Sequence, residues 1–180
     1  LFSDPYYPQL LRGISQACNQ HDYTLTFFLV SSKEDEKKIL TRVPNKSLLD
    51  GVLIQSGHHG DQGIIGQMID ADMPQVVIGR PFRSDNFSYV DVDNVRGAYY
   101  AVAHLVRLGY HRISTITGPL ESTVGLDRRE GYMQALVERG IDIHQDLIVE
   151  GDFTELSGYY AMESLLKQQP KAVFAASDAM

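Results

Sequence analysis

Short apolar runs alternate with longer amphipathic stretches along the chain, and this alternation restricts the fold more than any other feature. Most of the runs are apolar at successive residues, which is typical of strands covered on both faces. Strands are predicted at residues 23–30, 51–54, 75–78, 88–92, 113–116, 147–149 and 172–175. Helices are predicted at residues 8–19, 95–108, 128–139 and 155–168. Such alternation indicates an α/β fold with parallel sheets.

The predicted elements carry end signals and divide the chain into two similar halves. Asn94 is expected to cap the helix at 95–108, and Gly109 and Gly140 are expected to adopt the left-handed conformation that ends a helix. A polar stretch at 91–94 lies between the halves, so we expect an N-terminal lobe at residues 1–91 and a C-terminal lobe at 92–180. The sequence breaks off at what looks like a helix start, so the C-terminal lobe is expected to be incomplete.

Charge and apolar patterning exclude several classes of partner. The formal net charge is −7 and Lys and Arg form no block, so this segment by itself is a poor DNA binder. The longest apolar runs are too short to cross a bilayer, so no membrane partner is expected. The single cysteine, Cys18, rules out an internal disulfide. With no signal-peptide pattern at the start, this favours a cytoplasmic location.

Polar and aromatic residues gather where the predicted strands end, which is where parallel α/β sheets bind ligands. Aromatic faces can cover the apolar side of a sugar ring, and a guanidinium can donate to paired oxygens. We therefore expect a small, sugar-like ligand. The candidate ligand-binding residues are Asp4, Tyr6, Tyr7, Arg80, Ser122, Arg128, Phe153, Ser177 and Asp178.

Four of these candidates have ordinary alternatives. Tyr6 and Tyr7 could pack under the first helix, and Phe153 could belong to the core. Arg128 shares a helix start with Asp127 and Glu130, so a solvated ion pair is its alternative.

No catalytic or metal motif is complete. Asp91-Val92-Asp93-Asn94 begins like a calcium loop, but Val102 occupies the twelfth position, where a bidentate Glu is required. His58-His59 has no further ligand at metal-binding spacing, and no Gly-x-Ser-x-Gly turn places a serine nucleophile. We therefore predict a protein that is not an enzyme and uses no metal and no cofactor.

Segments spread over nearly the whole chain resemble the effector domain of the lactose/galactose repressor family. Each piece is short, but they follow one another in the family's order. They are Asp4-Pro5-Tyr6-Tyr7, Asp50-Gly51-Val52-Leu53-Ile54, Val90-Asp91-Val92-Asp93-Asn94, Leu108-Gly109-Tyr110-His111-Arg112-Ile113, Gly118-Pro119-Leu120, Gly151-Asp152-Phe153 and Ser177-Asp178-Ala179-Met180.

This resemblance implies a periplasmic-binding-protein-like fold, with two lobes that close on a small effector. The arginine that matches Arg128 grips effector oxygens in relatives, and the aromatic residue that matches Phe153 covers the ring. The loop matching residues 4–7 and the position matching Ser177 also face the cleft. The purine-binding branch has an arginine where this chain has Ser122, which disfavours a nucleobase.

The same resemblance implies how the effector acts. Members are homodimers and bind operator DNA through an N-terminal helix-turn-helix domain, which is absent from this chain. We therefore predict the effector-sensing and dimerisation domain of a bacterial transcription regulator that works as a repressor. Two alternatives stay open: a periplasmic sugar-binding protein of a transport system, and an α/β enzyme whose catalytic residues lie outside this segment.

Overall fold

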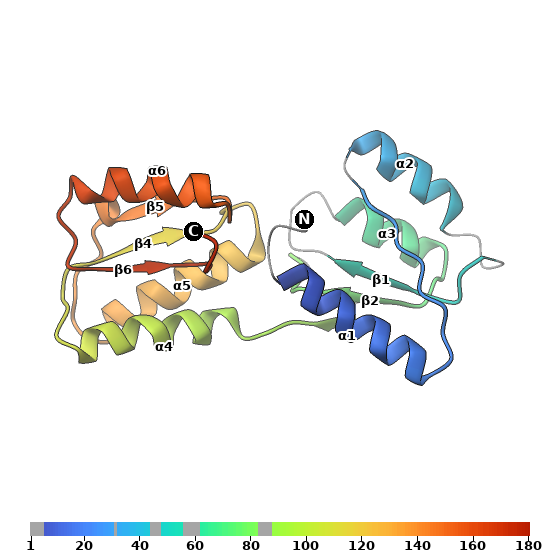
Figure 1. The fold of residues 1–180 in the computed structure, drawn as a ribbon, viewed down its shortest axis with the longest axis horizontal. Helices are drawn as coiled ribbons and strands as arrows, with labels where there is room; N and C mark the ends of the chain where they lie inside the picture. The colour runs from blue at the N-terminus through green and yellow to red at the C-terminus, as the bar shows by residue number, and fades with distance from the viewer. Residues whose placement is uncertain (1–5, 31, 44–47, 56–61, 83–87) are drawn as a thin grey trace. The chain divides into compact units, whose positions relative to one another are not determined.

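The computed structural model (Figure 1) describes residues 6–30, 32–43, 48–55, 62–82 and 88–180. The chain divides into two compact units. The first unit, Leu1–Asn45, contains α1 (Tyr6–Gln20) and α2 (Lys33–Arg42). α2 is not among the helices predicted from the sequence. Ser32 caps this helix by accepting a hydrogen bond from the Asp35 backbone N–H at 3.1 Å, and acidic residues fill its first turn.

The strand predicted at residues 23–30 is wrong, because the structure gives this segment no regular secondary structure. Its large apolar side chains are exposed, among them Tyr23 and Phe27. A strand is stabilised by hydrogen bonds to a neighbouring strand, and no described residue pairs with this segment. The apolar composition therefore does not by itself produce a strand here.

The second unit, Lys46–Met180, contains two parallel three-stranded sheets. The first has the order β1-β2-β3, with β1 (Val52–Gln55), β2 (Gln75–Ile78) and β3 (Tyr89–Val90), and α3 (Gln62–Asp70) connects β1 to β2. The second has the order β5-β4-β6, with β4 (Ile113–Thr117), β5 (Ile148–Glu150) and β6 (Ala172–Ala175). Parallel sheets and an α/β fold are thus confirmed.

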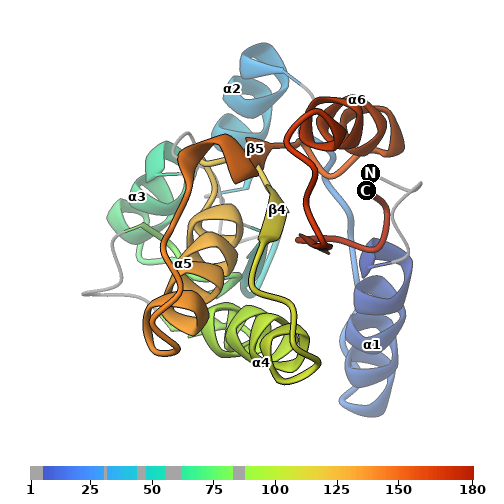
Figure 2. The same ribbon diagram turned by 90° about the vertical axis from the view of Figure 1, so that its left-hand side faces the viewer.

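Helices cover both faces of the second sheet. α6 (Glu155–Leu166) lies on one face, and α4 (Asn94–Arg107) and α5 (Thr123–Val137) lie on the other, as Figures 1 and 2 both show. The core between α4, α5 and the sheet contains Val102, Tyr132 and Leu136, and the core under α6 contains Ile116 and Leu165. β4 is consequently buried at every residue.

The helix ends agree only in part with the sequence predictions. Gly109 and Gly140 have positive φ angles of 90° and 66°, as predicted. Asn94, however, is the first residue of α4, and the cap is Asp93, whose side chain accepts from the Arg96 backbone N–H at 2.9 Å. The predicted division into lobes at residues 1–91 and 92–180 stays a prediction.

Candidate functional site

The carboxyl edge of the second sheet brings several predicted site residues close together. Because the three strands are parallel, the segments that follow them leave the sheet at the same edge. Backbone hydrogen bonds hold these segments together: Gly151 N–H donates to Thr117 O at 2.8 Å, and Ala176 N–H donates to Ile116 O at 2.9 Å. Segments far apart in the sequence thus lie together at one edge of the sheet. Arg128, Phe153 and Ser177 lie in or beside these segments.

Arg128 lies in the second turn of α5 and links three elements. Its Nε–H donates to Asn94 Oδ1 at 2.9 Å, and its Nη1 donates to the Ala176 carbonyl oxygen. Asn94 is 6% exposed, so one partner of this arginine is a buried amide at the start of α4. The guanidinium is therefore held between α4, α5 and the end of β6. Its role toward a ligand stays a prediction.

Phe153 follows β5 in an unusual backbone conformation. Its φ angle is 67°, in the left-handed region that residues other than glycine rarely adopt. The side chain is half-buried, and its ring lies against Gly118 at the end of β4. Such conformations cost about 1–3 kcal/mol and persist where the surroundings hold them in place.

Ser122 and Ser177 use their hydroxyl groups within the chain. Ser122 is buried and caps α5: its hydroxyl donates to Pro119 O at 2.7 Å and accepts from the Gly125 backbone N–H at 3.0 Å. Ser177 Oγ accepts from the Ala179 backbone N–H at 3.3 Å, and the neighbouring Asp178 is exposed. The local hydrogen bonds explain the positions of both serines without a ligand.

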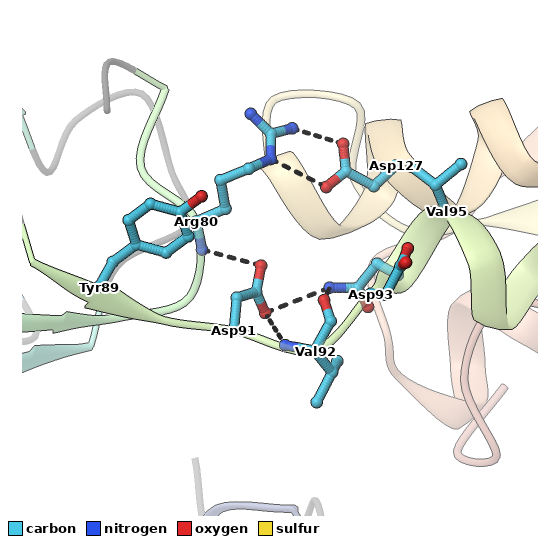
Figure 3. Close-up of a pocket in the computed structure, with 8 residues that line it drawn as sticks. Arg80, Tyr89, Asp91, Val92, Asp93, Val95 and Asp127 are labelled. Atoms are coloured by element: carbon cyan, nitrogen blue, oxygen red, sulfur yellow. Dashed lines mark hydrogen bonds and ion pairs between the residues drawn. The ribbon is translucent and has the colours of Figure 1, made fainter. Parts of the chain in front are cut away.

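Arg80 follows β2 and forms a bidentate ion pair with Asp127 of α5 (Figure 3). Its Nε–H donates to Asp127 Oδ2 at 3.1 Å, and its Nη2 reaches the other carboxylate oxygen. The Arg80 backbone is held as well, since its N–H donates to Asp91 Oδ2 at 3.0 Å and its carbonyl accepts from Thr123 Oγ1 at 2.8 Å. The hydrogen bond to Asp127 raises the pKa of the Arg80 guanidinium, so this group stays charged.

A pocket of about 470 Å³ lies beside this ion pair, where the chain passes from β3 to α4 (Figure 3). Among the predicted site residues that the structure describes, Arg80 alone lines it. The pocket is rich in carboxylates; its lining residues are Arg80, Tyr89, Asp91, Val92, Asp93, Asn94, Val95 and Asp127. Among the described residues, no group of three His, Cys, Asp or Glu side chains could hold a metal ion. The carboxylates serve instead as hydrogen-bond acceptors for Arg80, Val92, Asn94 and Arg96.

Tyr6 and Tyr7 belong to the other unit, at the start of α1. Their rings meet edge to face with centroids 5.3 Å apart, and Tyr6 is 49% exposed. Asp4 lies outside the described residues. A ligand-binding role for these three residues stays a prediction.

Sequence reasoning missed Asp127 as a partner of Arg80, Asn94 as a partner of Arg128, and Gly118 as the surface that the Phe153 ring contacts. The residues of each pair are 47, 34 and 35 positions apart, respectively, and they meet only through tertiary packing. The polar stretch at 91–94 is the signal in the sequence that lies nearest to these contacts, since it contains Asn94.

Comparison with known proteins identifies the family of this chain. Residues 2–180 match the family described as periplasmic binding proteins and sugar binding domain of LacI family. The chain belongs to this family. The family resemblance and the periplasmic-binding-protein-like fold predicted from the sequence are thereby confirmed.

Among curated relatives, the HTH-type transcriptional regulator CelR of Thermobifida fusca is 36% identical over 185 residues, covering 100% of this chain and 54% of the relative. The HTH-type transcriptional repressor PurR of Photorhabdus laumondii is 31% identical over 180 residues, covering 98% of this chain and 52% of the relative. The chain thus spans about half the length of the curated relatives it matches. These relatives are transcription regulators rather than enzymes, and they do not favour the transport alternative.

Solved structures of LacI-family regulators share the fold. A transcriptional regulator CelR–cellobiose complex superimposes with a TM-score of 0.90 at 30% identity, covering 97% of this chain and 54% of that one. A LacI regulator from Bacillus cereus subsp. cytotoxis gives a TM-score of 0.90 at 28% identity, covering 99% of this chain and 64% of that one. In the part of the chain that the structure describes, no helix is long and apolar enough to cross a membrane.

Proposed function

We propose that this chain is the saccharide-binding sensor domain of a cytoplasmic bacterial transcription repressor. The whole protein would act as a homodimer and bind operator DNA through a segment outside these 180 residues, because a domain with a net charge of −7 is a poor DNA binder. The observation that carries the proposal is the family match over residues 2–180, with a relative whose solved structure contains cellobiose.

We assign the effector site to the carboxyl edge of the second sheet, with Arg128 and Phe153 as its main groups. The Arg128 guanidinium is held in place by Asn94 and by the Ala176 carbonyl, so little conformational freedom would be lost when it binds a hydroxyl or a paired oxygen. The half-buried Phe153 ring offers an apolar face for the C–H groups of a sugar. Arg80, Ser122, Ser177 and Asp178 remain further candidates.

Effector binding would act on the rest of the protein by shifting a conformational equilibrium. Residues on both sides of the 91–94 connection contribute candidate ligand groups, for example Arg80 and Arg128. A ligand that contacts both sides binds best when they are close together. It shifts the population toward this closed state by the difference between its affinities for the closed and the open state. In a dimer, this change would alter the operator affinity, by a coupling typically of about 1–3 kcal/mol.

A thermal-shift screen of the full-length protein tests the effector class. The screen uses cellobiose, maltose, glucose, hypoxanthine and guanine. A saccharide at a hundredfold excess over its dissociation constant should stabilise the protein by about 2.7 kcal/mol. If the nucleobases raise the melting temperature and none of the sugars does, the saccharide assignment is wrong.

The Arg128→Ala variant tests the site. Loss of the guanidinium should weaken saccharide binding by about 1.5–3 kcal/mol, the range for hydrogen bonds of a charged group. It should also lower the free energy of unfolding, because Asn94 and Ala176 lose a partner. Calorimetry measures the first effect and denaturant unfolding the second. Arg107→Ala, at an exposed position of α4, is the matched control and should change neither. Unchanged saccharide affinity in Arg128→Ala would leave this arginine a purely structural role.

A further inference from the structure

We propose that Gly118 is a positioning residue that seats the Phe153 ring in the effector site. The proposal rests on the proposed function and assigns a role to a glycine that has no side chain to bind a ligand. Gly118 is buried at the end of β4, against the outer edge of the ring. A Cβ atom at this position would lie 2.1 Å from Phe153 Cζ and 2.4 Å from Cε1, so any other residue would overlap the ring.

Gly118 differs from Gly125 and Gly131, two other tightly packed glycines, in what it contacts. A Cβ at Gly125 would lie 2.1 Å from the Pro119 carbonyl oxygen, and one at Gly131 would lie 2.1 Å from the Val95 carbonyl oxygen. These glycines face backbone, which cannot move without disturbing the fold. Gly118 faces the far end of a side chain, which can rotate away. Substitution at Gly118 should therefore displace the ring and leave the fold intact.

The backbone on both sides of Phe153 is tied down, so the ring cannot adjust by a shift of the loop. Asp152 Oδ1 accepts from Thr154 N–H at 2.9 Å and from Thr154 Oγ1 at 2.5 Å. Asp152 N–H donates to Ser157 Oγ at 3.0 Å, and Gly151 N–H donates to Thr117 O at 2.8 Å. These bonds hold Phe153 at a φ of 67°, which sets the direction in which its side chain leaves the chain.

The position of the ring therefore depends on two separate features, the loop at Phe153 and the glycine at 118. The loop sets where the Phe153 side chain starts, and the missing side chain at Gly118 leaves the space in which the ring lies. A ring placed in this way presents the same face to each ligand, which suits the flat apolar side of a pyranose. Gly118 thus contributes to selection for saccharides through the position of the ring.

A double-mutant cycle on the full-length protein tests this role, with cellobiose as the probe in calorimetry. The variants are Gly118→Ala, Phe153→Ala and the double variant, and Gly97→Ala is the control because a Cβ there meets nothing within 4 Å. Gly118→Ala should weaken cellobiose binding about tenfold, within the range found for coupled neighbours. When Phe153→Ala is already present, the same change should have less than about a twofold effect, because no ring remains to be displaced.

Equal losses of affinity in both backgrounds, or no loss in either, would overturn the proposal. If the wild-type protein does not bind cellobiose but another sugar raises its melting temperature, the cycle is run with that sugar. If no sugar binds, the proposed effector class fails, and unfolding in urea decides the role of Gly118. The positioning role of Gly118 is then supported if Gly118→Ala lowers the urea midpoint of unfolding more in the wild-type background than in the Phe153→Ala background. It is overturned if both shifts are the same.

Discussion

The two sheets of the Lys46–Met180 unit are both parallel and three-stranded, but they are covered differently. β4, in the second sheet, is buried at all five residues, between α6 on one face and α4 and α5 on the other (Figure 2). β1, in the first sheet, alternates between half-buried and exposed residues, and Leu53 is 50% exposed. An apolar run thus predicts a strand, but the helices around it decide how much that strand contributes to stability.

The largest difference between the two sheets should be the loss of unfolding free energy when an aliphatic strand residue is replaced by alanine. Ile116 of β4 is 2% exposed and packs with Ala161 and Leu165, so Ile116→Ala should lower the free energy of unfolding by about 3 kcal/mol. Leu53→Ala should cost less than about 1 kcal/mol, because half of this side chain is already exposed. Denaturant unfolding measures both. Equal losses would show that the first sheet is as well covered as the second.

Helix packing over the second sheet gives the next effect. Gly131 of α5 lets α4 approach so closely that a Cβ would lie 2.1 Å from the Val95 carbonyl oxygen. Gly131→Ala should therefore destabilise the protein by about 2 kcal/mol through overpacking, despite the better helix propensity of alanine. Gly97→Ala, on the exposed face of α4, has no such neighbour and should stabilise by up to about 1 kcal/mol. Thermal and urea unfolding of the two variants should thus give opposite signs.

The buried hydroxyl under the second sheet predicts a response to alkaline pH. Tyr132 is fully buried and donates to Ile113 O at 2.8 Å, and burial raises its pKa to about 12. The unfolded chain loses this proton near pH 10, so the stability that the neutral hydroxyl contributes is complete below pH 10 and is lost as the pH rises toward 12. By pH 12 the loss should amount to about 2 kcal/mol, since raising the pKa from 10 to about 12 corresponds to about 2.7 kcal/mol in full.

Urea unfolding of the wild type and of Tyr132→Phe between pH 8 and pH 12 isolates this contribution. The other tyrosines titrate in both proteins, so the difference between the two free energies of unfolding belongs to Tyr132. That difference should shrink above pH 10. A constant difference over the whole range would mean that Tyr132 ionises as easily in the folded protein as in the unfolded chain.

The smallest effect concerns the ion pair between Arg80 and Asp127, which follow strands of different sheets. The side chains are 37% and 15% exposed, so water screens the pair in part, and a cycle of Arg80→Ala and Asp127→Ala should give a coupling of about 1 kcal/mol. The Lys38–Glu34 pair on α2 is 62% and 78% exposed and should give at most about 0.5 kcal/mol. High salt should reduce both couplings. If the Arg80–Asp127 coupling is no larger than that of Lys38–Glu34, this pair does not contribute to holding the two sheets together.

The strands and helix ends could be predicted from the sequence because the residues that produce them are close together in the chain. Successive apolar residues form most of β1, β2 and β6, and the glycines at 109 and 140 adopt their positive φ angles because glycine lacks a Cβ. The strand predicted at 23–30 failed for a reason that is not local, since a strand requires a partner. Helix α2 was missed because its residues are mostly charged, and its stability depends on the Ser32 cap and the acidic first turn.

The sequence by itself determined which segments carry the candidate site, because residues that follow parallel strands reach the same edge of a sheet. Only the tertiary structure decided which side chains meet. It paired Arg80 with Asp127, tied Arg128 to Asn94 and Ala176, and laid the Phe153 ring on Gly118. Each contact joins residues far apart in the chain, and hydrophobic burial between helices and sheet brings them together without a local pattern that sequence reading could detect.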